Sequence, residues 1–437
     1  MNNSNNSVRF RLFIMMVLEF GIWGAWLPQI FGYLPSLHFS PWQQSAILNA
    51  FPFAALVAMF FSNQFADRNF AAEKFLAFSQ FIGGLAMLGL AFTHDFWTFF
   101  ALMMIHCLFY VPTLSIVNSI AFANLKDSKD FGTISIGGAV GWIMAAWPFV
   151  FILVDWQKVA QAHTTGFMDW LKTALGSGLT GPVLQERLRW TYVVAGAASL
   201  LLAGFSLTLP HTPPKKAAAG EDKFAWLEAL RLLCKPFLLV LWIVTLLNTF
   251  MLNAYFNWAF VFMGSPQVGI SGNWITPVMS TGQIAQMFVM AILGLTLKRL
   301  GWRLTLLLGT LAQVLRFAIF AYFPQDTTLV ILANLLHGFC YAFCFTAVYI
   351  FVEEYFPKDA RASAQGLFNV MILGLGVMAA NSLCPWLLQH YTSAGMTDFR
   401  TLFNIAGGVG VVAMLMLALF FNPPAVKQPD PAQPAQT

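Results

Sequence analysis

The chain has 437 residues, of which 58% are hydrophobic and only 9% are charged, and its formal net charge is +5. About a quarter of the residues in an average soluble domain are charged. This composition therefore excludes a soluble enzyme, a nucleic-acid-binding protein and a disordered chain. It predicts a polytopic protein in contact with the lipid bilayer, with many of its 45 Phe and 15 Trp residues facing lipid and the membrane interfaces.

The chain opens with a polar segment that carries two arginines, and a long apolar run from 10 to 34 follows it. About 20 apolar residues are enough to cross a bilayer. A cleavable signal peptide has a shorter apolar core and a cleavage site of small residues. We therefore expect this run to be the first transmembrane helix.

Long apolar runs recur along the rest of the chain, and they are continuous rather than alternating, which excludes a β-barrel. With the first run they predict an all-α membrane protein of twelve transmembrane helices at 10–34, 44–65, 75–93, 96–122, 132–154, 190–210, 236–263, 275–297, 302–323, 328–352, 363–388 and 401–421.

The longest polar stretch on one side, 211–235, divides these spans into two sets of six. We expect an N-terminal six-helix bundle (1–210), a cytoplasmic linker with a short amphipathic helix (211–235), a C-terminal six-helix bundle (236–421) and a disordered, proline-rich tail (422–437). Such duplication is typical of secondary transporters, which bind substrate near the bilayer midplane between the two halves.

The basic residues are distributed unequally between the two sides of the membrane. Seventeen of the 23 Lys and Arg residues fall on the side of the termini, five fall on the opposite side, and Arg316 lies within a span. Basic loops stay in the cytoplasm. We therefore expect a multi-pass membrane protein with both termini in the cytoplasm.

Two charged residues lie deep inside predicted spans. Glu19 is eight residues after Arg11, about 12 Å along a helix, and a charge at that depth costs roughly 2.5–3.5 kcal/mol. We expect Glu19 to carry a proton or contact substrate; the alternative is a protonated side chain that only packs. Arg316 lies in the outer half of the ninth span, and we expect it to reach the outer interface.

Amide side chains recur at helical spacing on the seventh and eighth spans. Asn253 and Asn257 are four residues apart, and Gln283 and Gln286 are three apart, so each pair shares a helix face. Amides both donate and accept hydrogen bonds, which suits a neutral polar ligand such as a nucleobase or a ribose. The alternative is hydrogen bonding between helices, which is common in membranes.

Small and reactive residues in the spans have mostly structural interpretations. Gly137 and Gly141 form a G-x-x-x-G pattern that favours close helix packing. The five cysteines are expected to be small buried hydrophobes. The sequence contains no catalytic constellation, nucleotide-binding loop or metal-ligand spacing, so we expect neither an enzyme nor a cofactor or metal.

Several stretches resemble the major facilitator superfamily and, within it, the bacterial nucleoside:proton symporter family. FADRNFAAEK after the second span is similar to the superfamily's loop motif, with Asp67 and Arg68 at its central pair. The more specific stretches are LEFGIWGAWL (18–27), YVPTLSIVNSIAF (110–122), GGAVGWIMA (137–145), STGQIAQ (280–286) and VEEYFPKDARASAQGLF (352–368), which follow in order along nearly the whole chain.

This resemblance implies a substrate cavity to which Trp142 and Tyr341 contribute aromatic rings that stack on a base. His337 lies one turn before Tyr341, and it either carries protons or packs as a neutral ring. Three positions at which family members carry charged residues hold neutral residues here: Ser135 occupies the position of an Arg, Gln286 that of a Glu, and Ala342 that of an Asp found in some members. We therefore expect a nearly neutral cavity that prefers neutral ligands.

The resulting prediction is a secondary transporter of the bacterial inner membrane, expected to be monomeric, that carries a nucleoside or a similar small neutral polar solute by alternating access. Its expected partners are that solute, a proton and the lipid bilayer. Two alternatives remain at this stage: a transporter of the same fold for a sugar or another metabolite without proton coupling, and a sensor that does not transport.

Overall fold

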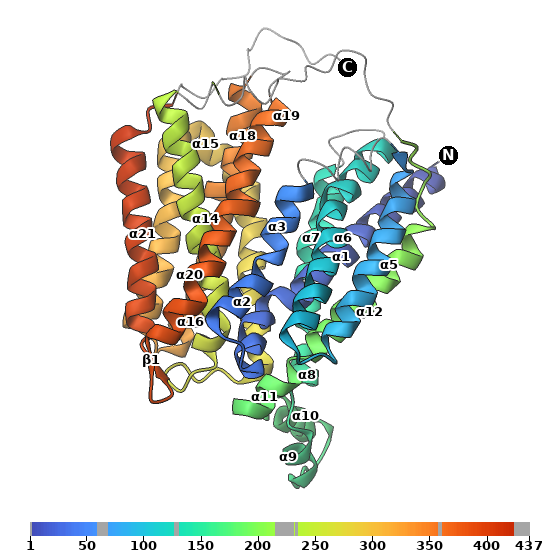
Figure 1. Cartoon of the computed structure of the whole chain (residues 1–437), viewed down its shortest axis with the longest axis vertical. Coiled ribbons are helices and arrows are strands. Elements are labelled where there is room, and N and C mark those ends of the chain that lie inside the picture. Colours follow the sequence, from blue (N-terminus) through green and yellow to red (C-terminus); the bar gives the residue numbers. More distant parts are fainter. Residues whose placement is uncertain are drawn as a thin grey trace.

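The computed structural model describes residues 2–58, 69–125, 131–214, 231, 235–356 and 361–423. It consists almost entirely of long helices that run side by side (Figure 1). We call α1–α12 the N-terminal half and α14–α21 the C-terminal half. The helices of the N-terminal half are α1 (Asn2–Tyr33), η1 (Leu34–Leu37), α2 (Pro41–Leu48), α3 (Ala50–Val57), α5 (Ala72–Leu90), α6 (Phe96–Asn124), α7 (Phe131–Ala146), α8 (Phe149–Ile152), α9 (Trp156–Gln161), α10 (Phe167–Gly176), α11 (Gly181–Arg187) and α12 (Trp190–Ser206).

The C-terminal half contains the remaining helices and one short hairpin. Its elements are α14 (Pro236–Met263), α15 (Gly272–Tyr322), α16 (Thr327–Ala333), α17 (Leu336–Cys340), η4 (Tyr341–Thr346), α18 (Ala347–Tyr355), α19 (Arg361–Asn369), η5 (Val370–Leu375), α20 (Gly376–His390), β1 (Thr392–Ser393), β2 (Met396–Thr397) and α21 (Phe399–Phe420). β1 and β2 pair antiparallel, with Thr392 opposite Thr397. Residues Tyr341–Thr346 and Val370–Leu375 are π-helical.

The predicted all-α membrane fold is confirmed. In the described part of the chain, nine helices are long and apolar enough to cross a membrane. One of them, α15, has 51 residues and is interrupted at Gly301, whose φ of 72° is left-handed. Glycine takes this conformation without steric strain. The break therefore separates two helices, which correspond to the eighth and ninth predicted spans.

Figure 1 shows the N-terminus at one end of the bundle, and α9–α11 and β1 at the other. We call these ends the terminal face and the loop face. In the described part of the chain, four helices are each preceded by an aspartate whose side chain accepts a backbone N–H of the first turn, which satisfies a donor that the helix itself leaves free. These caps are Asp95 for α6, Asp155 for α9, Asp326 for α16 and Asp398 for α21.

The predicted close packing at Gly137 and Gly141 is confirmed. These glycines of α7 lie directly against the backbone of α1. A Cβ atom on Gly137 would lie 2.7 Å from the carbonyl oxygen of Phe13, and one on Gly141 would lie 2.0 Å from that of Val17. Contacts this short leave no room for any side chain. The α1–α7 contact therefore depends on the two glycines, and it holds in place the helix that carries Glu19.

Hydrogen bonds join the two halves toward the loop face. The Nδ2 atom of Asn49 donates to Oγ of Ser382 at 3.0 Å, and Nδ2 of Asn381 donates to the carbonyl oxygen of Leu48 at 3.0 Å. Farther along the same face, Nε1 of Trp274 donates to the carbonyl oxygen of Leu175 at 2.9 Å. These contacts close the interface between the halves at that end.

Several predictions concern residues outside the described ranges. Asp67 and Arg68 of the loop motif lie there, as do most of the predicted linker 211–235 and most of the tail 422–437. The proposed division into two bundles with a linker between them stays a prediction. The prediction for the cysteines holds where it is tested, since the described ones are free and buried: Cys107, Cys340, Cys344 and Cys384.

The glycine contact on α7 predicts the effect of a single methyl group. We expect Gly141→Ala to lower the stability of the folded protein by about 1–3 kcal/mol, because the two helix backbones must move apart. Gly204→Ala on α12 is the matched control, since a Cβ there meets no atom within 4 Å. Thermal unfolding of both variants in detergent measures the difference. Equal midpoints for the two variants would contradict the packing argument.

Candidate functional site

Glu19 lies inside the N-terminal half, where it is fully buried on α1. Its Oε2 atom accepts a hydrogen bond from Nε2 of Gln80 on α5 at 2.8 Å, and its Oε1 lies 2.7 Å from Oγ1 of Thr113 on α6. The hydroxyl of Tyr110 donates to the backbone carbonyl of Glu19 at 2.8 Å, and Oγ of Ser199 on α12 donates to Oε1 of Gln80 at 2.6 Å. Side chains of α5 and α6 therefore bond to this carboxyl group of α1, and α12 joins the network through Gln80.

Counting protons in this network shows what Glu19 can do. The single hydroxyl proton of Thr113 has two candidate acceptors, Glu19 Oε1 and the carbonyl oxygen of Tyr110. When Glu19 is protonated, it donates to Thr113, and Thr113 donates to Tyr110, so every side-chain hydrogen bond of Glu19 and Thr113 is made. When Glu19 is ionised, Thr113 donates to the carboxylate and only the bond to Tyr110 is lost. The same heavy-atom positions thus accommodate both protonation states.

A second polar cluster lies in the C-terminal half, where α17 packs against α15. A Cβ atom on Gly282 would lie 2.8 Å from Cβ of His337, and one on Gly338 would lie 2.4 Å from the backbone nitrogen of Gln286. These glycines bring the two helices into backbone contact. The approach places Gln283, Gln286 and His337, which the sequence predicted separately, beside one another.

Contacts in this cluster run inward from Gln283. The Nε2 positions of Gln283 and His337 are 3.0 Å apart, and Nδ1 of His337 lies 3.4 Å from Nη1 of Arg316. The buried amide oxygen of Gln286 has no hydrogen-bond partner among the described residues. Gln283 and Gln286 are half-buried, whereas His337 is buried. Gln283 and Gln286 are therefore the less buried residues of the cluster, although the amide oxygen of Gln286 itself is enclosed.

The expectation that Arg316 reaches the outer interface is wrong. The side chain is fully buried, and its Cζ atom lies 3.9 Å from the centre of the Tyr255 ring. The Tyr255 hydroxyl in turn donates to Oδ1 of Asn334 at 2.8 Å. Stacking on an aromatic face is a favourable alternative to hydration for a guanidinium group. The sequence marked Arg316 as unusual but gave no sign of this partner on α14.

Aromatic rings connect the C-terminal cluster to the other half. The rings of Trp142 and Phe256 are 6.4 Å apart, and those of Phe256 and His337 are 6.0 Å apart. Trp142 also packs edge-on against Trp23 at 5.5 Å. The sequence singled out Trp142 but missed Phe256, which is one of many aromatic residues on an apolar helix. Phe256 places Trp142 and His337 on one continuous surface.

The two asparagines of α14 have different surroundings. Asn253 is half-buried, and its Nδ2 donates to the carbonyl oxygen of Thr249 at 2.9 Å, which leaves its carbonyl oxygen as an acceptor. Asn257 is buried and donates to Oδ1 of Asn381 at 3.1 Å. Asn381 in turn bonds to Leu48 of the other half, so Asn257 belongs to the contact between the halves.

Tyr341 begins the π-helical turn that follows His337, and the two rings are 6.2 Å apart. Isolated π-turns inside helices are frequent at functional sites because they redirect the side chains beside them. Ala342, the next residue, is buried, whereas Ser135 on α7 is exposed. The predicted binding residues Trp142, Gln283, Gln286 and Tyr341 therefore lie around His337 and Phe256, while Glu19 belongs to a separate network.

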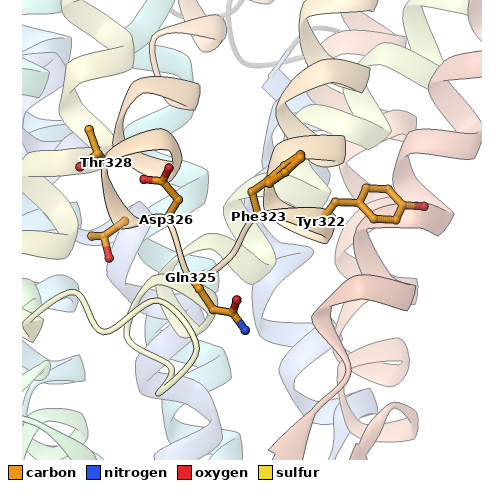
Figure 2. Close-up of a pocket in the computed structure, with 6 residues that line it drawn as sticks. Tyr322, Phe323, Gln325, Asp326 and Thr328 are labelled. Atoms are coloured by element: carbon orange, nitrogen blue, oxygen red, sulfur yellow. The ribbon is translucent and has the colours of Figure 1, made fainter.

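A surface pocket at the turn between α15 and α16 is lined by residues that belong to neither cluster (Figure 2). Tyr322 lines the pocket and its ring extends toward α21, where Arg400 lies over the ring at 4.8 Å. Asp326 accepts the backbone N–H of Leu329 at 3.0 Å as a helix cap. Both side chains are engaged in local structure, and we assign no ligand to this pocket.

Comparison with known proteins identifies relatives along nearly the whole chain. A family model described as nucleoside H+ symporter matches residues 6–174 and 178–426. The putative nucleoside transporter YegT of Escherichia coli (strain K12) is 29% identical over 419 residues, which cover 94% of this chain and 92% of the relative. The nucleoside permease NupG of the same organism is 25% identical over 444 residues, which cover 98% and 99%.

Solved structures share the fold. An aspartate-to-alanine variant of the nucleoside transporter NupG superimposes with a TM-score of 0.80 at 25% identity, over 95% of this chain and 100% of that one. A D-xylose–proton symporter superimposes with a TM-score of 0.66 at 15% identity, over 95% and 98%. The second likeness shows the fold alone, which is that of the major facilitator transporters.

Proposed function

The chain belongs to the nucleoside H+ symporter family, and on that premise we propose that it carries a nucleoside and a proton together across the bacterial inner membrane. It is a secondary transporter and not an enzyme. The alternatives of a sugar carrier or a sensor are not favoured, since the family and the relatives with similarity along the whole chain are described as nucleoside transporters. The observation that carries the coupling proposal is the buried carboxyl group of Glu19 in a network that fits two protonation states.

The proposed substrate site lies between the halves, at the surface formed by Gln283, Gln286, Tyr341 and Trp142. The amides hydrogen-bond to the polar groups of the nucleoside, and the unpaired oxygen of Gln286 accepts from an N–H or O–H of the ligand. Trp142 approaches from the other half and stacks on the base. Asn253 contributes an acceptor from α14. Asn257 acts at the contact between the halves, where its bond to Asn381 is made.

The proposed proton carrier is Glu19, and it acts by changing charge inside the N-terminal half. An ionised Glu19 in the hydrocarbon region costs roughly 2.5–3.5 kcal/mol, so proton binding and release change the relative stability of the transporter's conformations. His337 fits a positioning role better than the predicted proton-carrying role, because its Nδ1 atom faces the guanidinium of Arg316. Alternating access then follows from rocking of the halves about the substrate site.

The proposed orientation places the terminal face in the cytoplasm and the loop face outside, with one chain sufficient for transport. The distribution of Lys and Arg supports it, because the loops on the side of the termini hold most of the basic residues. The contacts through Asn49, Asn381 and Trp274 then close the outer side of the transporter.

Replacement of Glu19 by an amide tests the coupling. We expect Glu19→Gln to abolish concentrative nucleoside uptake and its pH dependence while counterflow exchange continues, because the amide hydrogen-bonds like a protonated carboxyl but cannot ionise. Glu73→Gln is the matched control. Glu73 is also buried in this half, but it lies at the start of α5 and pairs with His211. Uptake of labelled uridine with and without a protonophore is the measurement. Normal pH-dependent accumulation in Glu19→Gln would exclude Glu19 as the carrier.

Truncation of Gln283 tests the substrate site. We expect Gln283→Ala to weaken nucleoside binding roughly 5- to 150-fold, because a buried ligand group loses its partner, at about 1–3 kcal/mol. Gln313→Ala, on the other side of the break at Gly301, should leave affinity unchanged, since that amide bonds to Asn248. Titration calorimetry with uridine, adenosine, a hexose and a nucleoside monophosphate measures both effects. Tightest binding of the monophosphate, or unchanged affinity in Gln283→Ala, would refute the proposed site.

Cysteine labelling tests the orientation. We expect an impermeant maleimide to modify Lys172→Cys in intact cells, because Lys172 is exposed on α10 at the loop face. Lys215→Cys, in the predicted linker, should react only after the membrane is opened. The parent protein with its native cysteines is the control for background labelling. The reverse pattern would invert the proposed topology.

A further inference from the structure

Arg316 is a buried cation whose contacts do not include a carboxylate in the described part of the chain. Its Nη1 lies 3.4 Å from Nδ1 of His337, and its Nε and Nη2 have no hydrogen-bond partner among the described residues. The Tyr255 ring covers the guanidinium at 3.9 Å. Retaining a charge in this position is expensive, and a group kept at such a cost inside a membrane is expected to serve the function. Its contact with His337 connects it to the substrate site.

The chemistry of these groups fixes the position of each proton. A guanidinium has donors and no acceptor, so Nδ1 of His337 must accept from Arg316 and carries no proton. The imidazole proton is therefore on Nε2. That N–H must donate to an acceptor, and the atom of Gln283 that faces it at 3.0 Å must then be the amide oxygen. The structure places the amide nitrogen of Gln283 there. Rotating the amide group by a half-turn exchanges its nitrogen and oxygen, which are nearly equal in size, and gives the required arrangement.

We propose that Arg316 is a positioning residue for the substrate site, which acts through the tautomer of His337 to fix the orientation of the Gln283 amide. With its oxygen held by His337, Gln283 turns its NH2 group toward the ligand as a hydrogen-bond donor. Gln286, three residues along the same face, supplies an unpaired amide oxygen. The site therefore presents a donor and an acceptor in a fixed order.

The donor at Gln283 and the acceptor at Gln286 define which ligand groups can bind beside them. This inference about the ligand rests on the proposed function. The edge of the base or ribose that meets Gln283 must carry an acceptor, such as a carbonyl oxygen or an unprotonated ring nitrogen. The group that meets Gln286 must carry a donor. Without Arg316, the imidazole proton is free to move to Nδ1, and Gln283 loses its fixed orientation.

The tautomer can be measured directly in the full-length protein. We expect ¹⁵N spectra of histidine-labelled protein in lipid to show His337 with a protonated Nε2 and an unprotonated Nδ1, assigned by the loss of these signals in His337→Asn. Arg316→Met, which has no donor, should mix the tautomers, whereas Arg316→Lys keeps a donor and should preserve the signature. Gln313→Ala, on the same helical stretch but bonded to Asn248, should leave it unchanged. A proton on Nδ1 in the unaltered protein would overturn the proposal.

Ligand binding tests whether the relay acts through Gln283. We expect Arg316→Met to weaken uridine binding to folded, monodisperse protein roughly 5- to 150-fold, and Arg316→Lys to restore part of the affinity. The variant with both Arg316→Met and Gln283→Ala should bind no more weakly than Gln283→Ala alone, since residues in one network do not add. Additive losses, or unchanged affinity in Arg316→Met, would refute the relay.

The two experiments separate the relay from the proposed function. If the unaltered protein binds no nucleoside, the proposed function fails, while the tautomer of His337 still decides whether Arg316 orients the cluster. If nucleosides bind and the tautomer does not respond to Arg316→Met, the relay fails and the proposed function stands.

Discussion

The absence of water from the bilayer core is the constraint on which this structure depends. Every buried polar group there needs a partner supplied by the protein itself. Glu19 and Arg316 are each fully buried in a different half, and they differ in this respect, since Nε and Nη2 of Arg316 have no hydrogen-bond partner among the described residues. The carboxyl group is enclosed by hydroxyl and amide groups that can donate or accept. The guanidinium is stacked on a tyrosine ring and directed at an imidazole nitrogen. The first solution permits a change of charge, and the second favours a fixed one.

Backbone proximity makes both clusters possible. Gly137 and Gly141 let α7 lie against α1, the helix that carries Glu19, and Gly282 and Gly338 let α17 lie against α15, which carries the two glutamines. In a membrane, where lipid is as apolar as the side chains, helices associate through such close contact and through interhelical hydrogen bonds. Small residues therefore define where the polar residues of neighbouring helices can meet.

The proposed proton site lies inside the N-terminal half, whereas the proposed substrate site lies between the halves, and this separation suits a symporter. A charge change at Glu19 is confined to the network of α1, α5, α6 and α12. Trp23, one turn beyond Glu19 on α1, packs against Trp142, and Trp142 packs against Phe256 of the other half. Movement of α1 relative to its neighbours can thus reach the substrate site through packed rings, without a direct hydrogen bond between the two sites.

The sequence by itself determined the membrane fold, most of the span positions and the residues worth examining, because hydropathy and the cost of intramembrane charge are local properties. Runs of apolar residues, a buried Glu19 and the amides at helical spacing need no partner to be recognised. Family resemblance added Trp142 and Tyr341. Only the tertiary structure decided what each of these residues touches. It placed Gln80, Thr113 and Ser199 around Glu19 from three other helices. It placed Arg316 against Tyr255 and His337 and not at the expected outer interface. It also placed Asn257 at the contact between the halves. The partner of a buried polar group lies on another helix, far away in the chain, and no local pattern specifies which helix that is.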